Sequence, residues 1–183
     1  MLLGALPPGR NVEQHDYFFS IAESLSDLLP DMKAFWPDAG KTLHIDGWRE
    51  VTKVDNYAIT VMSENGEAPE QPDKLFFLNL GGYSSGKLEE QHYTVLTVQQ
   101  NKMQAALAAK QSVFFKSNTL KGIAASHIDE KYGIDVDEVY QIEDVLPADV
   151  KNKFRIEIGD GSELSEDIVH LGDIKLGKLT KFL

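Results

Sequence analysis

Hydrophobic and polar residues alternate along the chain in patterns that predict a mixture of strands and helices. Residues 15–21 and 92–98 are rich in aromatic and β-branched side chains, which strands prefer. Residues 74–80 form a short apolar run that ends at two glycines, which is typical of a buried strand. Residues 57–61 and 154–158 predict two closing strands, and the second of these alternates with a period of two.

Two segments have the spacing or the composition of helices. Within residues 27–36, apolar side chains recur at helical spacing and fall on one face. Asp27 is the expected N-cap, and Pro30 lies in the first turn, where its missing N–H costs little. Residues 101–114 are rich in alanine, which has the highest helix propensity. We expect both helices to be core elements on one side of the sheet.

The predicted elements occur twice in the same order, and the residues around them also repeat. Residues 3–15 and 80–92 align without a gap and share six of thirteen positions, including two glycines and a Glu-Gln-His triplet. The tripeptide His-Ile-Asp at residues 44–46 recurs at residues 127–129. The sequence therefore predicts an α+β fold made of two pseudo-symmetric ββαβ repeats, with a mixed or antiparallel sheet and helices packed on one side.

This repeat divides the chain into four parts. Residues 1–63 form the first repeat unit, and residues 74–158 form the second. Residues 64–73 are polar and contain glycine and two prolines, which indicates a linker. Residues 159–183 have no counterpart in the first unit, and we expect this C-terminal extension to add a strand or a tail.

Charge and composition narrow the classes of partner. The 183 residues include 29 acidic and 18 basic side chains, which gives a net charge of −11. This charge repels phosphate backbones and anionic lipids, so we expect no nucleic acid and no membrane as a partner. The chain has no cysteine, which excludes disulfides and thiolate metal sites and fits a cytoplasmic location. A small ligand, a protein partner and a homo-oligomer all stay open.

Histidine and carboxylate residues lie together in each duplicated motif. Imidazole and carboxylate groups are ligands of zinc, iron and manganese, and they also serve as acid and base pairs. The alternative is that these histidines are structural hydrogen-bonding groups that hold loops, in which case no cofactor is needed. The candidate ligands of a divalent transition metal are Glu13, His15, His44, Asp46, Glu90, His92, His127 and Asp129.

The glycine-containing loops of the two repeats are candidates for binding a small ligand. Neither loop ends in the Gly-Lys-Ser/Thr sequence of a P-loop or leads directly into a helix, so a nucleotide phosphate site is not indicated. Their glycines are expected to allow positive φ angles or close backbone approach. The candidate ligand-binding residues are Gly9, Arg10, Asn11, Gly86 and Lys87.

The stretch from Gly9 to His15, together with residues 43–48 and 54–57, resembles a small bacterial family called domain of unknown function 1543. Members of that family carry one or two copies of the domain, so the resemblance implies two tandem copies over residues 2–158. The second copy has Leu88 where the first has Asn11. The family has no established activity, so the resemblance implies no catalytic residue.

Two functional hypotheses follow from the sequence. The first is a non-enzymatic module that binds a small ligand or another protein through the glycine loops and the Glu-Gln-His residues. The alternative is a metal-dependent enzyme that uses the duplicated histidine and carboxylate motifs. Whether the protein is an enzyme is left open by the sequence.

Overall fold

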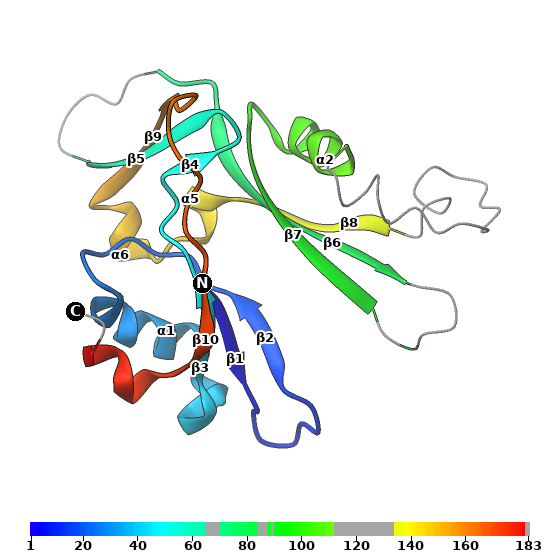
Figure 1. Ribbon diagram of the computed structural model, residues 1–183, viewed down its shortest axis with the longest axis vertical. Coiled ribbons are helices and arrows are strands. Elements are labelled where there is room, and N and C mark those ends of the chain that lie inside the picture. Colours follow the sequence, from blue (N-terminus) through cyan, green and yellow to red (C-terminus); the bar gives the residue numbers. More distant parts are fainter. Residues whose placement is uncertain (65–69, 84–87, 89, 112–133, 182–183) are drawn as a thin grey trace.

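The computed structural model describes residues 1–64, 70–83, 88, 90–111 and 134–181, and in these residues it shows an α+β protein with antiparallel sheets (Figure 1). The strands are β1 (Leu2–Ala5), β2 (Gln14–Tyr17), β3 (His44–Trp48), β4 (Lys53–Val54), β5 (Tyr57–Ser63), β6 (Lys74–Tyr83), β7 (Glu90–Gln99), β8 (Ile134–Gln141), β9 (Phe154–Asp160) and β10 (His170–Lys175). The helices are α1 (Leu29–Phe35), α2 (Lys102–Lys110), α5 (Ile142–Val145) and α6 (Ala148–Lys151), with 3-10 segments η1 (Leu25–Leu28), η2 (Pro37–Thr42) and η3 (Leu176–Lys181). Within the described ranges, no helix is long and apolar enough to cross a membrane.

The first sheet has the strand order β10-β3-β1-β2. Gly4 of β1 lies opposite His15 of β2 on one side and opposite His44 of β3 on the other. The register between β1 and β3 shifts by one residue at Asp46, which is therefore the extra residue of a β-bulge. The pairs that flank this bulge are Leu3 with Ile45 and Leu2 with Gly47.

The second sheet has the strand order β7-β6-β8, with β6 in the middle. Gly81 of β6 lies opposite His92 of β7 and opposite Asp135 of β8. The register between β6 and β8 shifts at Asp137, in the same place relative to the central glycine as in the first sheet. The flanking pairs are Leu80 with Val136 and Asn79 with Glu138.

The third sheet, β4-β5-β9, joins the two halves of the chain. β5 and β9 pair antiparallel along their whole length, from Tyr57 opposite Asp160 to Ser63 opposite Phe154. Gln71, in the predicted linker, extends this contact because its amide donates to the carbonyl of Ile156 at 2.8 Å.

Burial separates the two faces of each of the first two sheets. Leu3, Ala5 and Ile45 of the first sheet pack with Met32 of α1, so this face lies in the core. Side chains alternate along a strand, so Gly4, His15 and His44 are on the opposite face. In the second sheet Phe76, Leu78 and Leu80 pack with Ala105 and Ala109 of α2, whose small side chains allow close approach of the helix.

The faces that point away from α1 and α2 meet at one end. The rings of Tyr17 on β2 and Phe77 on β6 are 5.1 Å apart between centroids. From this contact the two sheets diverge, as Figure 1 shows for β2 and β7. By alternation Tyr17 shares a face with His15, and Phe77 shares a face with Gly81. His15 and His44 of the first sheet and His92 of the second thus lie on the two diverging faces.

Most of the predicted elements are present, with different boundaries. The strands predicted at 57–61, 74–80, 92–98 and 154–158 correspond to β5, β6, β7 and β9. The strand predicted at 15–21 ends at Tyr17, because the apolar residues that follow turn into the core. The predicted C-terminal extension supplies β10, which pairs with β3 of the first sheet.

Two sequence expectations about the helices and their following strands were wrong. Asp27 is not the N-cap: Ser24 is, and the Asp27 carboxylate accepts the Ser24 N–H at 3.1 Å, as the third residue of a capping box does.

The strand that follows the helix and returns to the central strand is β3 in the first half and β8 in the second. The predicted closing strands β5 and β9 instead pair with each other.

Candidate functional site

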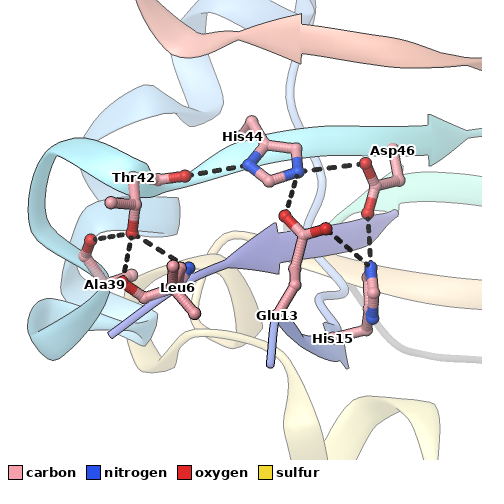
Figure 2. A network of polar contacts seen from close by, with 7 residues as sticks. All are labelled: Leu6, Glu13, His15, Ala39, Thr42, His44 and Asp46. Carbon is pink, nitrogen blue, oxygen red and sulfur yellow. Dashed lines mark hydrogen bonds and ion pairs between the residues drawn. The ribbon is translucent and has the colours of Figure 1, made fainter. Parts of the chain in front are cut away.

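Four polar side chains from the first half gather on the exposed face of the first sheet, above Gly4 (Figure 2). We call Glu13, His15, His44 and Asp46 the quartet. Glu13 directly precedes β2 and His15 lies on it, whereas His44 and Asp46 lie on β3. Because β1 separates these strands, its glycine at position 4 leaves the space in which the four side chains meet.

Each carboxylate of the quartet contacts both imidazoles. Nε2 of His44 lies 3.0 Å from Oε1 of Glu13 and 3.1 Å from Oδ1 of Asp46. Nε2 of His15 lies 3.0 Å from Oδ2 of Asp46 and 4.0 Å from Oε2 of Glu13. The side chains of His15 and Glu13 are each 46% exposed, whereas that of His44 is 14% exposed. The group is therefore open to solvent from the β2 side.

The ring of His44 is oriented by a backbone group. Its Nδ1 lies 2.8 Å from the carbonyl oxygen of Thr42. A carbonyl oxygen only accepts hydrogen bonds, so Nδ1 carries the hydrogen. In the neutral ring, Nε2 then has the free lone pair and points toward the carboxylates of Glu13 and Asp46.

The surroundings of His44 favour its protonated form. Burial by itself would lower the pKa of His44, but the hydrogen bond to Thr42 and the carboxylates of Asp46, Glu13 and Asp173 outweigh it and raise the pKa above its ordinary value of 6.5. In the absence of a metal ion, a proton on Nε2 thus holds the two carboxylates beside the ring.

The stability of the metal-free protein is expected to fall as the pH rises through the pKa of His44. Because this pKa is higher in the folded state, protonated His44 stabilises the fold fully below the unfolded value of about 6.5. That contribution is lost as the ring deprotonates. Urea unfolding in a chelating buffer from about pH 5 to pH 9 measures the change. His44→Gln should lack this component, and an identical pH profile in the variant would contradict it.

Glycine at position 4 lets the quartet pack closely against β1. Oδ2 of Asp46 is buried and accepts no hydrogen bond from the described residues, although Nε2 of His15 is 3.0 Å away. A Cβ atom at Gly4 would lie 2.5 Å from Oδ2 of Asp46 and 2.5 Å from Nε2 of His44. The side chains of His44 and Asp46 therefore occupy the space that any other residue at position 4 would need.

The side chains of the quartet contact one another instead of surrounding a common point. As they stand in the described part of the chain, no three or more histidine, aspartate and glutamate side chains are arranged so that they could hold a metal ion. Binding of an ion would require some of these side chains to rotate until their donor atoms face a common point. Glu13 and His15 can do so at the smallest cost, because they lie at the solvent-exposed edge of the sheet.

The counterpart group in the second half is looser. Nε2 of His92 lies 3.5 Å from Glu90, and Nδ1 lies 3.6 Å from Asp137. Nδ2 of Asn79 lies 3.1 Å from the same Nδ1, so the amide donates to it and the neutral ring carries its hydrogen on Nε2. Both nitrogens of His92 thus face side-chain partners, and no backbone carbonyl of the described residues orients the ring as Thr42 orients His44.

Four of the candidate residues lie outside the described residues: Gly86, Lys87, His127 and Asp129. At the register of His44 and Asp46, the second sheet has Asp135 and Asp137. Sequence reasoning missed Asp137 because it followed the repeated His-Ile-Asp tripeptide. The alternating Asp-Val-Asp at 135–137, directly before an apolar position, is the signal that could have found it.

The predicted ligand-binding loop borders a pocket on the other side of β2. This pocket has a volume of about 370 Å³. Gly9 adopts a φ of +79°, as expected for a glycine in a turn. Arg10 lines the pocket and Asn11 does not belong to its lining. The lining residues are Pro7, Pro8, Arg10, Gln14, Trp36 and Asp38.

Comparisons with known proteins relate the fold and the first half of the chain to uncharacterised proteins. The solved structure titled "Crystal structure of a protein Il1583 from Idiomarina loihiensis" matches with a TM-score of 0.63 and 19% sequence identity, over 96% of this chain and 93% of that chain. At this identity the likeness shows the fold alone. No curated protein matches the sequence. Residues 10–61, which include the whole quartet, match the family described as Domain of Unknown Function (DUF1543), in agreement with the resemblance seen in the sequence.

Proposed function

We propose that the protein binds one divalent transition metal ion through Glu13, His15, His44 and Asp46. The observation that supports this best is the position of Nε2 of His44, which lies between two carboxylates at 3.0 and 3.1 Å while Nδ1 donates to a backbone carbonyl. Histidines that bind metals typically donate their other ring N–H to a carbonyl or carboxylate in this way. The role proposed is binding, and no catalytic step is needed to explain the geometry.

Most of the nitrogen–oxygen distances in the quartet are close to the distances between neighbouring ligand atoms around a metal ion. An ion can therefore take the place of the proton on Nε2 of His44. In a four- to six-coordinate shell with bonds of about 2.1 Å, neighbouring donor atoms are roughly 3.0–3.4 Å apart. Three of the four nitrogen–oxygen distances in the quartet are 3.0–3.1 Å. Rotation of the half-exposed Glu13 and His15 side chains would bring their donor atoms around the ion.

The ligand types indicate which ions to expect. Two imidazole nitrogens with two carboxylates suit zinc, iron or manganese, whereas calcium and magnesium prefer shells made of oxygen atoms. Since the chain has no cysteine, thiolate ligands are excluded. We therefore expect zinc to bind more tightly than magnesium at this site.

The untagged protein, purified without chelators, is expected to contain or take up one equivalent of zinc, iron or manganese. Elemental analysis by plasma mass spectrometry gives the stoichiometry, and calorimetric titration with zinc gives the affinity. At a free ion concentration of 100 times Kd, bound metal should raise the free energy of unfolding by about 2.7 kcal/mol. The affinity should increase with pH, because the ion competes with protons for His15 and His44. Absence of bound metal, with no uptake on addition, would contradict the proposal.

We also infer that the two halves of the chain arose by duplication and that the first half keeps the metal site. The support is the shared register: a central glycine opposite a histidine, with a bulge at an aspartate, in both sheets. The second half has an aspartate at the position of His44, and among its described residues His92 is the imidazole of the group.

The other hypotheses from the sequence stay predictions. Binding of a small organic ligand near Arg10 has support from the pocket that this side chain lines. The expected cytoplasmic location, protein partner and homo-oligomer are not needed for the metal proposal and do not change it.

A further inference from the structure

Thr42 connects three parts of the structure around the quartet (Figure 2). Its hydroxyl lies 2.7 Å from the carbonyl of Ala39 in η2 and accepts the backbone N–H of Leu6 at 3.1 Å. Its own carbonyl oxygen accepts from Nδ1 of His44 at 2.8 Å. Leu6 begins the loop between β1 and β2, and the same loop carries Glu13.

We propose that Thr42 is a positioning residue that sets the tautomer of His44 and so leaves Nε2 free for the metal ion. The inference about the ion rests on the proposed function, whereas the inference about the tautomer concerns the metal-free protein. Thr42 itself does not contact the ion. It acts through the direction of its carbonyl group.

The hydroxyl of Thr42 fixes the direction of the Thr42 carbonyl, because its hydrogen bonds tie residue 42 to η2 and to the loop between β1 and β2. A hydroxyl has one hydrogen to donate. The nearer acceptor is Ala39, at 2.7 Å, and the carbonyl of Leu6 at 3.2 Å is the alternative. With the Leu6 N–H donating to the same oxygen, the backbone of residue 42 is tied to η2 and to the β1–β2 loop together. Loss of the hydroxyl should therefore loosen both His44 and Glu13.

The contrast with the second half supports a specific role for this contact. There the Nδ1 atom of His92 accepts from the side chain of Asn79, so the neutral ring carries its hydrogen on Nε2. His92 lies at the register of His15 in the second sheet, so a histidine on the corresponding face can carry its hydrogen on the other nitrogen, and the fold by itself does not dictate the tautomer. The carbonyl of Thr42 is what gives His44 the tautomer that a metal ligand needs.

The experiment reads the tautomer and the affinity separately in Thr42→Val and Thr42→Ser. Long-range proton–nitrogen NMR spectra of the metal-free protein, recorded above the pKa of His44, show which ring nitrogen carries the hydrogen. Wild type and Thr42→Ser should show the hydrogen on Nδ1. Thr42→Val should show a mixture or the Nε2–H form, and its zinc affinity should fall by about 10- to 100-fold, as for other residues that orient metal ligands.

Thr52→Val is the matched control. The hydroxyl of Thr52 donates to Asp167 at 2.7 Å, so this variant also loses a hydrogen bond from an exposed threonine. It should keep the tautomer of His44 and the affinity for zinc. Thr42→Ala replaces Thr42→Val if the valine methyl prevents folding, as judged by circular dichroism.

The outcomes separate the two proposals. An Nδ1–H ring in Thr42→Val, as in the wild type, would overturn the positioning role. A changed tautomer that Thr42→Ser restores would support it. If the tautomer changes but no variant or wild type binds zinc, the positioning role stands and the proposed metal function fails.

Discussion

Gly4→Ala is expected to abolish metal binding while the protein still folds. The new Cβ would lie 2.5 Å from Nε2 of His44, 2.9 Å from its Cε1 and 2.5 Å from Oδ2 of Asp46. All three atoms belong to the ends of side chains that can rotate away, so the backbone of β1 need not move. The donor atoms would then no longer converge, and we expect the zinc affinity to fall by more than about 100-fold, beyond the effect of losing an orienting contact.

The effect on stability should be modest by comparison. Inserting a methyl group into a packed site typically costs about 1–3 kcal/mol. Calorimetric titration with zinc and urea unfolding of the metal-free protein together measure both quantities. Gly159→Ala in β9 is the control, because a Cβ there meets no atom within 4 Å. Zinc binding by Gly4→Ala with wild-type affinity would show that the ion does not bind above Gly4.

Two of the strands that sequence reasoning missed, β3 and β8, contain a bulge. In β8 the extra residue Asp137 is followed by the exposed Glu138, which breaks the alternation of buried and exposed positions. In β3 burial alternates across Asp46, but this strand has only five residues, and Asp46 and Gly47 are residue types that strands disfavour. The strands with regular pairing, β6 and β7, were predicted closely.

The candidate site was predictable in its residues and not in its geometry. The repeated motifs pointed to Glu13 with His15 and to His44 with Asp46, since histidine and carboxylate residues recur together. Their convergence depends on β1 lying between β2 and β3, and the pairing of β1 with β3 joins segments about 40 residues apart, which leaves no local signal. The role of Thr42 could not be predicted, because it depends on a backbone carbonyl.

In the described residues, one difference separates the two histidine groups. A similar register and bulge bring a histidine, a glutamate and an aspartate together in each sheet. The described group of the first sheet has in addition the imidazole of His44, whose Nδ1 lies 2.8 Å from the carbonyl oxygen of Thr42. If the metal proposal is correct, this ring and not the Glu-Gln-His motif decides which half binds the ion.

His44→Gln is therefore expected to remove zinc binding, whereas His92→Gln should leave it unchanged. Glutamine lacks the imidazole nitrogen, so the carboxylates of Glu13 and Asp46 would keep only the nitrogen of His15, and the affinity should fall by more than about 100-fold. His92 occupies the position of His15 in the other sheet, so the second variant makes the same chemical change in the same fold. Calorimetric titration of both variants with zinc measures the difference.

The pair of variants distinguishes a site in the first half from other arrangements. Equal losses in the two variants would mean that both halves contribute ligands to one ion, across the diverging faces that meet at Tyr17 and Phe77. A loss in His92→Gln alone would transfer the site to the second half and contradict the proposed function of the quartet. Both substitutions remove a partly exposed imidazole from a strand, so a shared effect on folding would lower the free energy of unfolding of both variants. Only a loss of zinc affinity that is confined to His44→Gln supports the quartet as the site.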